Sequence, residues 1–341
     1  MHYVINGRIL PMNLDKFDGP LKKYLEAITL TATQERQINS ALESVLALAL
    51  TAFPEAEVYA QGSFATDTMA KPLTSKQGGG SAGQYDIDIA IESGAWGDAV
   101  GALDGLANAV EDDDTFGALT VDKTKNSCIR VEYPEDKTGV AFHIDLVPTK
   151  LENGKRTVPD RDTGNWKPSD AKQFAEWFNR KAEAQPGLRQ IAVILKRLRD
   201  LNGLTDNLKS IMLLALVERS YYSNGTIMGD LMSVLDGVVT LLSSADQPPF
   251  VANPVNSGEN LSDGIDDHQA VRSFIVSTRD KLVSATSSDD ASALKEIFGT
   301  GFEYSTESQV AAGLASAVTA VSSVRPTRAY GVSDGPSDDE R

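Results

Sequence analysis

Apolar residues recur at helical spacing near the start of the chain. They stand three or four residues apart, at Ile38, Leu42, Val45, Ala49 and Phe53. Thr31 lies just before this run and is followed three residues later by Gln34, the arrangement of a capping box at a helix N-terminus. Because Pro54 interrupts the pattern, we expect one long amphipathic helix that ends before it.

Other segments alternate apolar and polar residues, which predicts β-strands. The clearest are YDIDIAIE at 85–92 and VAFHIDLVP at 140–148, each with its apolar side chains on one face. Residues 128–133 predict an adjoining strand that pairs with the second of these as a hairpin. A short strand is expected at 57–61, and 64–70 fits either a helical turn or a loop. The first half of the chain is therefore mixed α/β.

The pattern changes past Pro159, where helical spacing dominates. The expected helices cover about 169–184, with Ser169 as cap, then 191–201, 207–222, 226–243, 266–286 and 308–322. Residues 247–263 are rich in Pro, Asn, Ser and Gly and predict a loop. We expect two domains, at 1–160 and 161–332, followed by a polar acidic tail at 333–341.

Composition narrows the class of protein. Apolar residues make up 41% of the 341 residues, which is typical of a folded chain. The 32 basic and 48 acidic residues leave a net charge of −16, and such a surface repels duplex nucleic acid. The single cysteine, Cys128, excludes an internal disulfide, and three scattered histidines do not form a zinc-ligand pattern.

The sequence predicts neither a secretory signal nor a membrane-spanning segment. The chain shows no basic leader followed by an apolar stretch at its start. Its longest apolar run is 211–217, far short of the roughly twenty residues that span a bilayer. We therefore expect a cytoplasmic protein without a membrane segment.

Three aspartates are the candidates for chemistry. Asp86 and Asp88 stand two apart on a strand, so they share a face with Cα atoms about 6.5 to 7 Å apart. A solvent-exposed strand face explains most such pairs. Asp145, on the second alternating strand, would complete the ligand set of a two-metal site for phosphoryl transfer if the fold brings it beside them.

Gly62 and Ser63 directly follow the short strand at 57–61. Glycine allows a close approach of the backbone, and exposed amides together with a hydroxyl bind anions such as a triphosphate. A literal GxGxxG also occurs at 78–83, but it precedes a strand where a dinucleotide site must follow one, so a flexible loop is the better interpretation.

These motifs, in this order, resemble a known family. QGSFATDT at 61–68, YDIDIAIE and FHIDLVP are similar to the nucleotidyltransferase core of the polymerase-β superfamily, and most similar to the bacterial cGAS/DncV-like nucleotidyltransferases, or CD-NTases. The resemblance implies an α+β fold: a polymerase-β-like core with a mixed sheet, and a helical, oligoadenylate-synthase-like C-terminal half, with the active site in the cleft of a bilobal molecule.

The resemblance also implies roles for particular residues. Asp86, Asp88 and Asp145 correspond to the catalytic, metal-binding triad, which would hold two Mg²⁺ ions or Mn²⁺ in their place. The implied nucleotide contacts are Gln61, Gly62, Ser63, Lys196, Ser210 and Arg130. A solvated helix face is the alternative for Lys196, a first-turn helix position for Ser210, and an edge-strand charge for Arg130.

The family resemblance implies synthesis of a cyclic oligonucleotide second messenger from NTPs such as ATP and GTP, in the bacterial antiphage system CBASS. The QGSFxxDT form favours a cyclic dinucleotide. Implied partners are an effector that senses the product, and proteins that activate the enzyme or conjugate its C-terminus. The alternatives are a cyclic trinucleotide synthase, a template-independent transferase to an RNA, a protein or a small molecule, and a nucleotide-binding module without activity.

Overall fold

The computed structural model describes residues 2–5, 8–11, 13–73, 84–134, 141–243, 249–263 and 265–306. The chain divides into two compact units, Met1–Tyr304 and Ser305–Arg341, and every element below belongs to the first. The helix expected at 308–322, the tail at 333–341 and the glycine run at 78–83 lie outside the described residues. The division of the chain at residue 160 stays a prediction.

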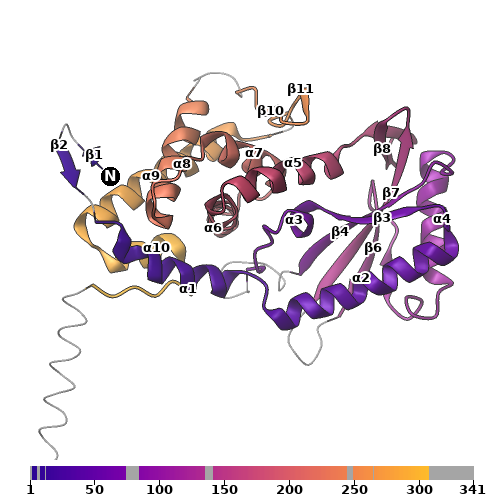
Figure 1. Ribbon diagram of the computed structural model, residues 1–341. Coiled ribbons are helices and arrows are strands. Elements are labelled where there is room, and N and C mark those ends of the chain that lie inside the picture. Colours follow the sequence, from indigo (N-terminus) through magenta and orange to yellow (C-terminus); the bar gives the residue numbers. More distant parts are fainter. Residues whose placement is uncertain are drawn as a thin grey trace, which may run out of the picture. The chain divides into compact units, whose positions relative to one another are not determined.

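A mixed sheet is the centre of the first half (Figure 1). Its strands are β3 (Glu57–Gln61), β4 (Tyr85–Glu92), β5 (Thr120–Asp122), β6 (Ile129–Tyr133), β7 (Phe142–Glu152), β8 (Lys155–Asp160) and β9 (Asn165–Pro168). The order is β3-β4-β7-β6-β5, and β8 continues from β7 to β9. β4 and β7 run parallel, whereas β3 pairs with β4 and β6 with β7 in antiparallel fashion. The strands predicted from the alternation of apolar and polar residues are therefore confirmed, and so is the predicted hairpin of β6 with β7.

Two helices cover the apolar face of this sheet. α2 (Ala32–Ala52) is the expected long helix, and Thr31 and Gln34 form the predicted capping box at its start. α4 (Ala99–Glu111) lies beside it, and both contribute fully buried side chains to a cluster that includes Ile87 and Ile144. Burial of one aliphatic side chain of this size stabilises the fold by about 1.5–3 kcal/mol. The packing of α2 and α4 on the apolar face therefore stabilises the sheet, and these two helices do not cover its polar face.

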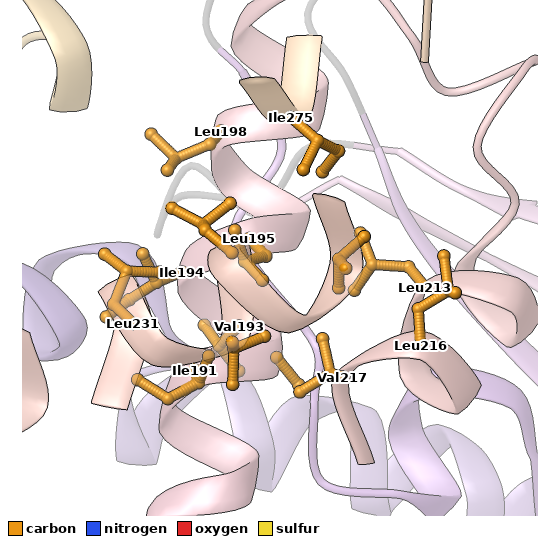
Figure 2. Close-up of a cluster of buried hydrophobic side chains, with 14 of the residues drawn as sticks. Ile191, Val193, Ile194, Leu195, Leu198, Leu213, Leu216, Val217, Leu231 and Ile275 are labelled. Carbon is orange, nitrogen blue, oxygen red and sulfur yellow. The ribbon is translucent and has the colours of Figure 1, made fainter. Parts of the chain in front are cut away.

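The second half is helical, as expected. Its helices are α5 (Ala171–Ala184), α6 (Gly187–Leu201), α7 (Ser210–Ser220), α8 (Ile227–Leu241), α9 (His268–Ser288) and α10 (Ala291–Phe298). Their apolar side chains form a second cluster, which includes Leu195 of α6, Leu213 of α7 and Ile275 of α9 (Figure 2). α1 (Asp18–Ile28) packs into the same cluster, where the Tyr24 hydroxyl donates to the carbonyl of Phe298 at 2.7 Å.

Several local predictions were wrong. α5 begins after Asp170, not after a Ser169 cap, because the chain first completes the β8–β9 hairpin, which the prolines at 159 and 168 concealed. The segment 64–70, for which a helical turn and a loop were both open, begins with the end of α3 (Gly62–Ala65) and continues without a helix; α3 itself starts directly at the end of β3. The expected loop at 247–263 contains the short hairpin of β10 (Ala252–Asn253) and β11 (Asn256–Asn260).

The remaining elements are short. The chain opens with a hairpin of β1 (His2–Ile5) and β2 (Arg8–Pro11), followed by the 3₁₀ turn Asp15–Phe17. Within the described residues, no helix combines the length and the apolarity that crossing a membrane requires.

Candidate active site

The polar face of β4 and β7 carries the predicted triad. The parallel register places Asp88 beside Asp145, and Asp86 beside His143. These four side chains lie on the face opposite to the isoleucines that pack on α2 and α4. The fold therefore brings together three carboxylates that are up to 59 residues apart in the sequence, which the alternation alone could not establish.

Arg130 of β6 is a direct partner of this group. Its Nε and Nη2 donate to the two carboxylate oxygens of Asp145, at 2.7 and 2.8 Å, and its Nη2 lies 3.8 Å from Oδ1 of Asp86. The alternative of an edge-strand charge is wrong, because β6 has β5 on one side and β7 on the other. A bidentate pair of this kind sets the orientation of the carboxylate as well as its charge.

His143 is a member of the cluster that the sequence analysis did not assign to the site. Its Nε2 lies 2.8 Å from Oδ1 of Asp86, and its Nδ1 lies 3.1 Å from Oε1 of Gln84. One ligand atom each from Asp86, His143 and Asp145 lies within 4.8 Å of the other two. The sequence feature that could have assigned His143 to the site is its position two residues before Asp145, which places both side chains on the same face of a strand.

Asp88 is the least compensated of the three carboxylates. Burial, and then the negative charges of Asp86 and Asp145, raise its pKa from 3.8 to about 7. Arg130 and His143 therefore leave part of the negative charge of the cluster unbalanced. Oxygen ligands from several carboxylates, with surplus negative charge, are the donor set that hard divalent cations prefer, so these residues fit a divalent metal ion.

The raised pKa of Asp88 predicts a pH dependence of cation binding. Below pH 7 a proton occupies this carboxylate, and a cation must displace it, so the affinity should fall about tenfold per pH unit there and level off above pH 7. Titration calorimetry with Mg²⁺ between pH 5.5 and 8.5 measures this slope. The Asp88→Asn variant should show a flatter profile, and an equally steep one would exclude Asp88 as the source.

Gly62 and Ser63 lie against the carboxylates. Gln61, the last residue of β3, is the register partner of Asp88, and α3 follows it beside β4 (Figure 1). Gly62 has φ +65°, and a Cβ at this position would lie 2.2 Å from Oδ2 of Asp88. The absence of a side chain is thus what allows the turn and the carboxylate to approach each other.

Ser210 faces the same space from the helical half. It is the first residue of α7, and a small cavity of about 100 Å³ is lined by Gly62, Ser63, Thr66 and Ser210 among others. The Ser210 hydroxyl accepts a hydrogen bond from Nη1 of Arg199 at 3.0 Å. The two predicted serines therefore line one cavity, although they come from different halves of the chain.

Lys196 is not part of a solvated helix face, so that alternative is wrong. It is 4% exposed, and its Nζ donates to the carbonyl of Thr68 at 3.0 Å. Burial and the neighbouring Arg199 lower its pKa to about 7. Lys196 reaches the segment that follows Ser63, and its direct contact with a nucleotide stays a prediction.

The first half of the chain is similar to a known protein family. Residues 16–182 match the family described as Second Messenger Oligonucleotide or Dinucleotide Synthetase domain. No curated protein matches the chain.

Three solved structures are similar along most of their length. The CD-NTase CdnG of Bradyrhizobium diazoefficiens, in complex with GTP, has a TM-score of 0.68 and 17% identity over 84% of this chain and 95% of its own. The cyclic AMP-GMP synthase DncV of Vibrio cholerae has a TM-score of 0.64 and 16% identity over 86% of this chain and 98% of its own. CdnC of E. coli MS115-1, with ATP, has a TM-score of 0.61 and 17% identity over 84% of this chain and 99% of its own. The expected α+β, polymerase-β-like fold is confirmed.

Proposed function

We propose that this chain, whose residues 16–182 match the Second Messenger Oligonucleotide or Dinucleotide Synthetase domain and whose fold is similar to that of CD-NTases, is a bacterial cGAS/DncV-like nucleotidyltransferase. It joins nucleoside triphosphates into a cyclic oligonucleotide and releases pyrophosphate. The observation that carries this proposal is the meeting of Asp86, Asp88 and Asp145 on one sheet face, directly beside the Gly62–Ser63 turn. A carboxylate cluster next to an anion-binding turn is what transfer of a nucleotidyl group requires.

Each residue of the site has a role in this reaction. Ser63 and Ser210, which line one small and mostly apolar cavity, would contribute their hydroxyls to binding the phosphates of the donor nucleotide. Asp86, Asp88 and Asp145 would hold two divalent ions, Mg²⁺ or Mn²⁺, which when bound supply Lewis acidity to the attacking hydroxyl and to the phosphorus. Arg130 keeps both oxygens of Asp145 oriented.

The proposed bond-forming step is an in-line displacement. A ribose hydroxyl of the acceptor attacks the α-phosphorus of the donor, the carboxylate of Asp145 accepts the hydroxyl proton or passes it to solvent, and pyrophosphate leaves. A second round within the linear product closes the ring. Positioning of the two nucleotides and stabilisation of charge provide the rate, because the protein supplies little covalent chemistry of its own.

The finer parts of the proposal concern substrates and context. DncV is named a cyclic AMP-GMP synthase, CdnG was solved with GTP and CdnC with ATP, which supports ATP and GTP as substrates and a cyclic dinucleotide as product. A cytoplasmic location, an effector that senses the product in CBASS signalling, and partners that activate the enzyme or conjugate its C-terminus belong to the same proposal.

A single assay tests the reaction class. Purified protein is incubated with ATP, GTP, CTP and UTP and Mg²⁺, and the phosphatase-resistant products are analysed by mass spectrometry. We expect a cyclic product whose mass identifies its bases and ring size, and no product from the Asp86→Ala, Asp88→Ala double variant. A product that forms only when an RNA, protein or small-molecule acceptor is added would instead identify a transferase to that acceptor.

A further inference from the structure

The turn that carries Ser63 is held by side chains of the helical half. Three successive donors from α5 and α6 each reach one backbone carbonyl of this turn: Asn179 Nδ2 to Ala65 at 2.9 Å, Arg189 Nε to Thr66 at 3.3 Å and Lys196 Nζ to Thr68 at 3.0 Å. Only the lysine had been assigned any role from the sequence. The turn thus has its backbone acceptors occupied on the side of the helices.

Asn179 and Arg189 act as one unit. Nη2 of Arg189 donates to Oδ1 of Asn179 at 3.0 Å, so the amide donates to the turn with its nitrogen while its oxygen is fixed by the guanidinium. Nε of Arg189 also lies 3.9 Å from Oδ2 of Asp67, whose backbone adopts a left-handed φ of +52°. This conformation costs energy for a residue other than glycine, and it persists where surrounding contacts determine it.

The turn is also bonded internally. The amide of Thr68 donates to the carbonyl of Ser63 at 3.0 Å, and the Thr66 hydroxyl lies 3.1 Å from the carbonyl of Gly62 and 2.8 Å from the Thr68 hydroxyl. A displacement at one residue of such a network moves its neighbours. The donors on α5 and α6 are therefore coupled to Ser63 through two or three hydrogen bonds.

These helices are a rigid anchor. Phe174 and Phe178 of α5 are buried in the same hydrophobic cluster as Ile191 and Leu195 of α6, so the helix backbones cannot shift independently. Figure 2 shows Ile191 and Leu195 within this cluster. A phosphate approaching the turn would be repelled by any carbonyl oxygen that turned toward it. Donors that draw these carbonyls toward the helices prevent this.

We propose that Asn179 and Arg189 are positioning residues, which fix the Gly62–Thr68 turn so that Ser63 receives the β- and γ-phosphates of the donor nucleotide. This inference rests on the proposed function, because it assumes that a triphosphate is the ligand of the turn. It assigns to two residues outside the recognised motifs the selection of triphosphates over shorter phosphate chains.

Ligand binding provides the first test. The affinities of an α,β-methylene ATP analogue and of AMP are measured with Mg²⁺ by calorimetry, for the wild-type protein and for Arg189→Met and Asn179→Leu. We expect the analogue to bind about tenfold more weakly to each variant, as the loss of one or two hydrogen bonds predicts. The affinity for AMP should change less than about twofold, because AMP lacks the phosphates that reach the turn.

Two further variants sharpen the comparison. Arg189→Lys keeps a cationic donor and should recover part of the affinity for the analogue. Arg180→Met removes a neighbouring exposed arginine of α5 and should leave both affinities unchanged. An equal loss for the analogue and AMP, or no loss for either, would overturn the proposal, since the residues would then act on overall structure or not at all.

A measurement without nucleotide separates this proposal from the proposed function. Amide hydrogen exchange of residues 63–68 should accelerate in Arg189→Met and Asn179→Leu but not in Arg180→Met. Unchanged exchange would refute the positioning role even if the wild-type protein binds nucleotide. Accelerated exchange in a protein that binds no triphosphate would instead refute the proposed function and the phosphate role together, leaving only the structural contact.

Discussion

Asp88→Asn should lower nucleotidyl transfer by about 1,000-fold or more and, at pH 8, make the protein more stable. The loss of activity follows from the position of Asp88 between Asp86 and Asp145, where an amide cannot replace a carboxylate as a ligand of divalent cations. The gain in stability follows from the same position, because an ionised Asp88 is half-buried beside the like charges of Asp86 and Asp145.

The sign of the stability effect depends on pH. The pKa of Asp88 is about 7 in the folded protein and 3.8 ordinarily, so the folded state binds the proton more tightly and loses stability as the pH rises from about 4 to 7. At about 1.4 kcal/mol per pKa unit, the loss is about 4 kcal/mol at most. The asparagine variant lacks this loss, so its advantage should appear at pH 8 and vanish near pH 4.

Denaturant unfolding at pH 4, 6 and 8, together with product formation at pH 8, measures both effects. Asp114→Asn, at an exposed aspartate in the loop after α4, is the matched control and should change neither. An asparagine variant that transfers nucleotides normally would remove Asp88 from the site. If the Asp88→Asn variant is less stable than the wild type at pH 8, the negative charge of Asp88 stabilises the folded protein and the expected gain is contradicted.

Gly62→Ala should reduce product formation by about 100-fold or more while costing little stability. The added Cβ would lie 2.2 Å from Oδ2 of Asp88, so the carboxylate must rotate away. Such a rotation is inexpensive for a flexible side chain, but a displacement of about 1 Å in a catalytic group can cost 100-fold in rate. The positive φ adds a strain of about 1 kcal/mol.

Gly154→Ala is the control for the strain alone. Gly154 has φ +73°, but no atom lies within 4 Å of the position of its Cβ, so this variant should lose a similar stability and keep full activity. Steady-state rates and melting temperatures of the two variants measure the difference. Equal activities would mean that the contact between the turn and Asp88 is unimportant for transfer.

The sequence predicted those features that depend on local periodicity. Alternation in 85–92 and 140–148 defined the two strands and the face that their aspartates share, because the direction of side chains in a strand repeats every two residues. The capping box at Thr31 and the helical spacing after Pro159 were also predicted correctly, because both depend on residues three or four positions apart in the chain. The predicted family and fold class came from the order of the motifs.

Other features required the tertiary structure. Lys196 is followed by Arg197 and Arg199 and was compatible with an exposed helix face, yet all three are buried, because residues 191–199 of α6 are buried on every face of the helix. α1 stands at the start of the chain but packs with helices that end near residue 298. Neither arrangement leaves a periodic signal.

The sequence by itself determined the strands, most of the helices and the candidate carboxylates, since these depend on neighbours in the chain. Only the tertiary structure decided that Arg130 pairs with Asp145, that His143 joins the cluster, and that Asn179 and Arg189 hold the turn of Ser63. Strand register and the packing of helices join residues that are up to 274 positions apart, as Tyr24 and Phe298 are, and those contacts arise from burial and hydrogen bonding in space.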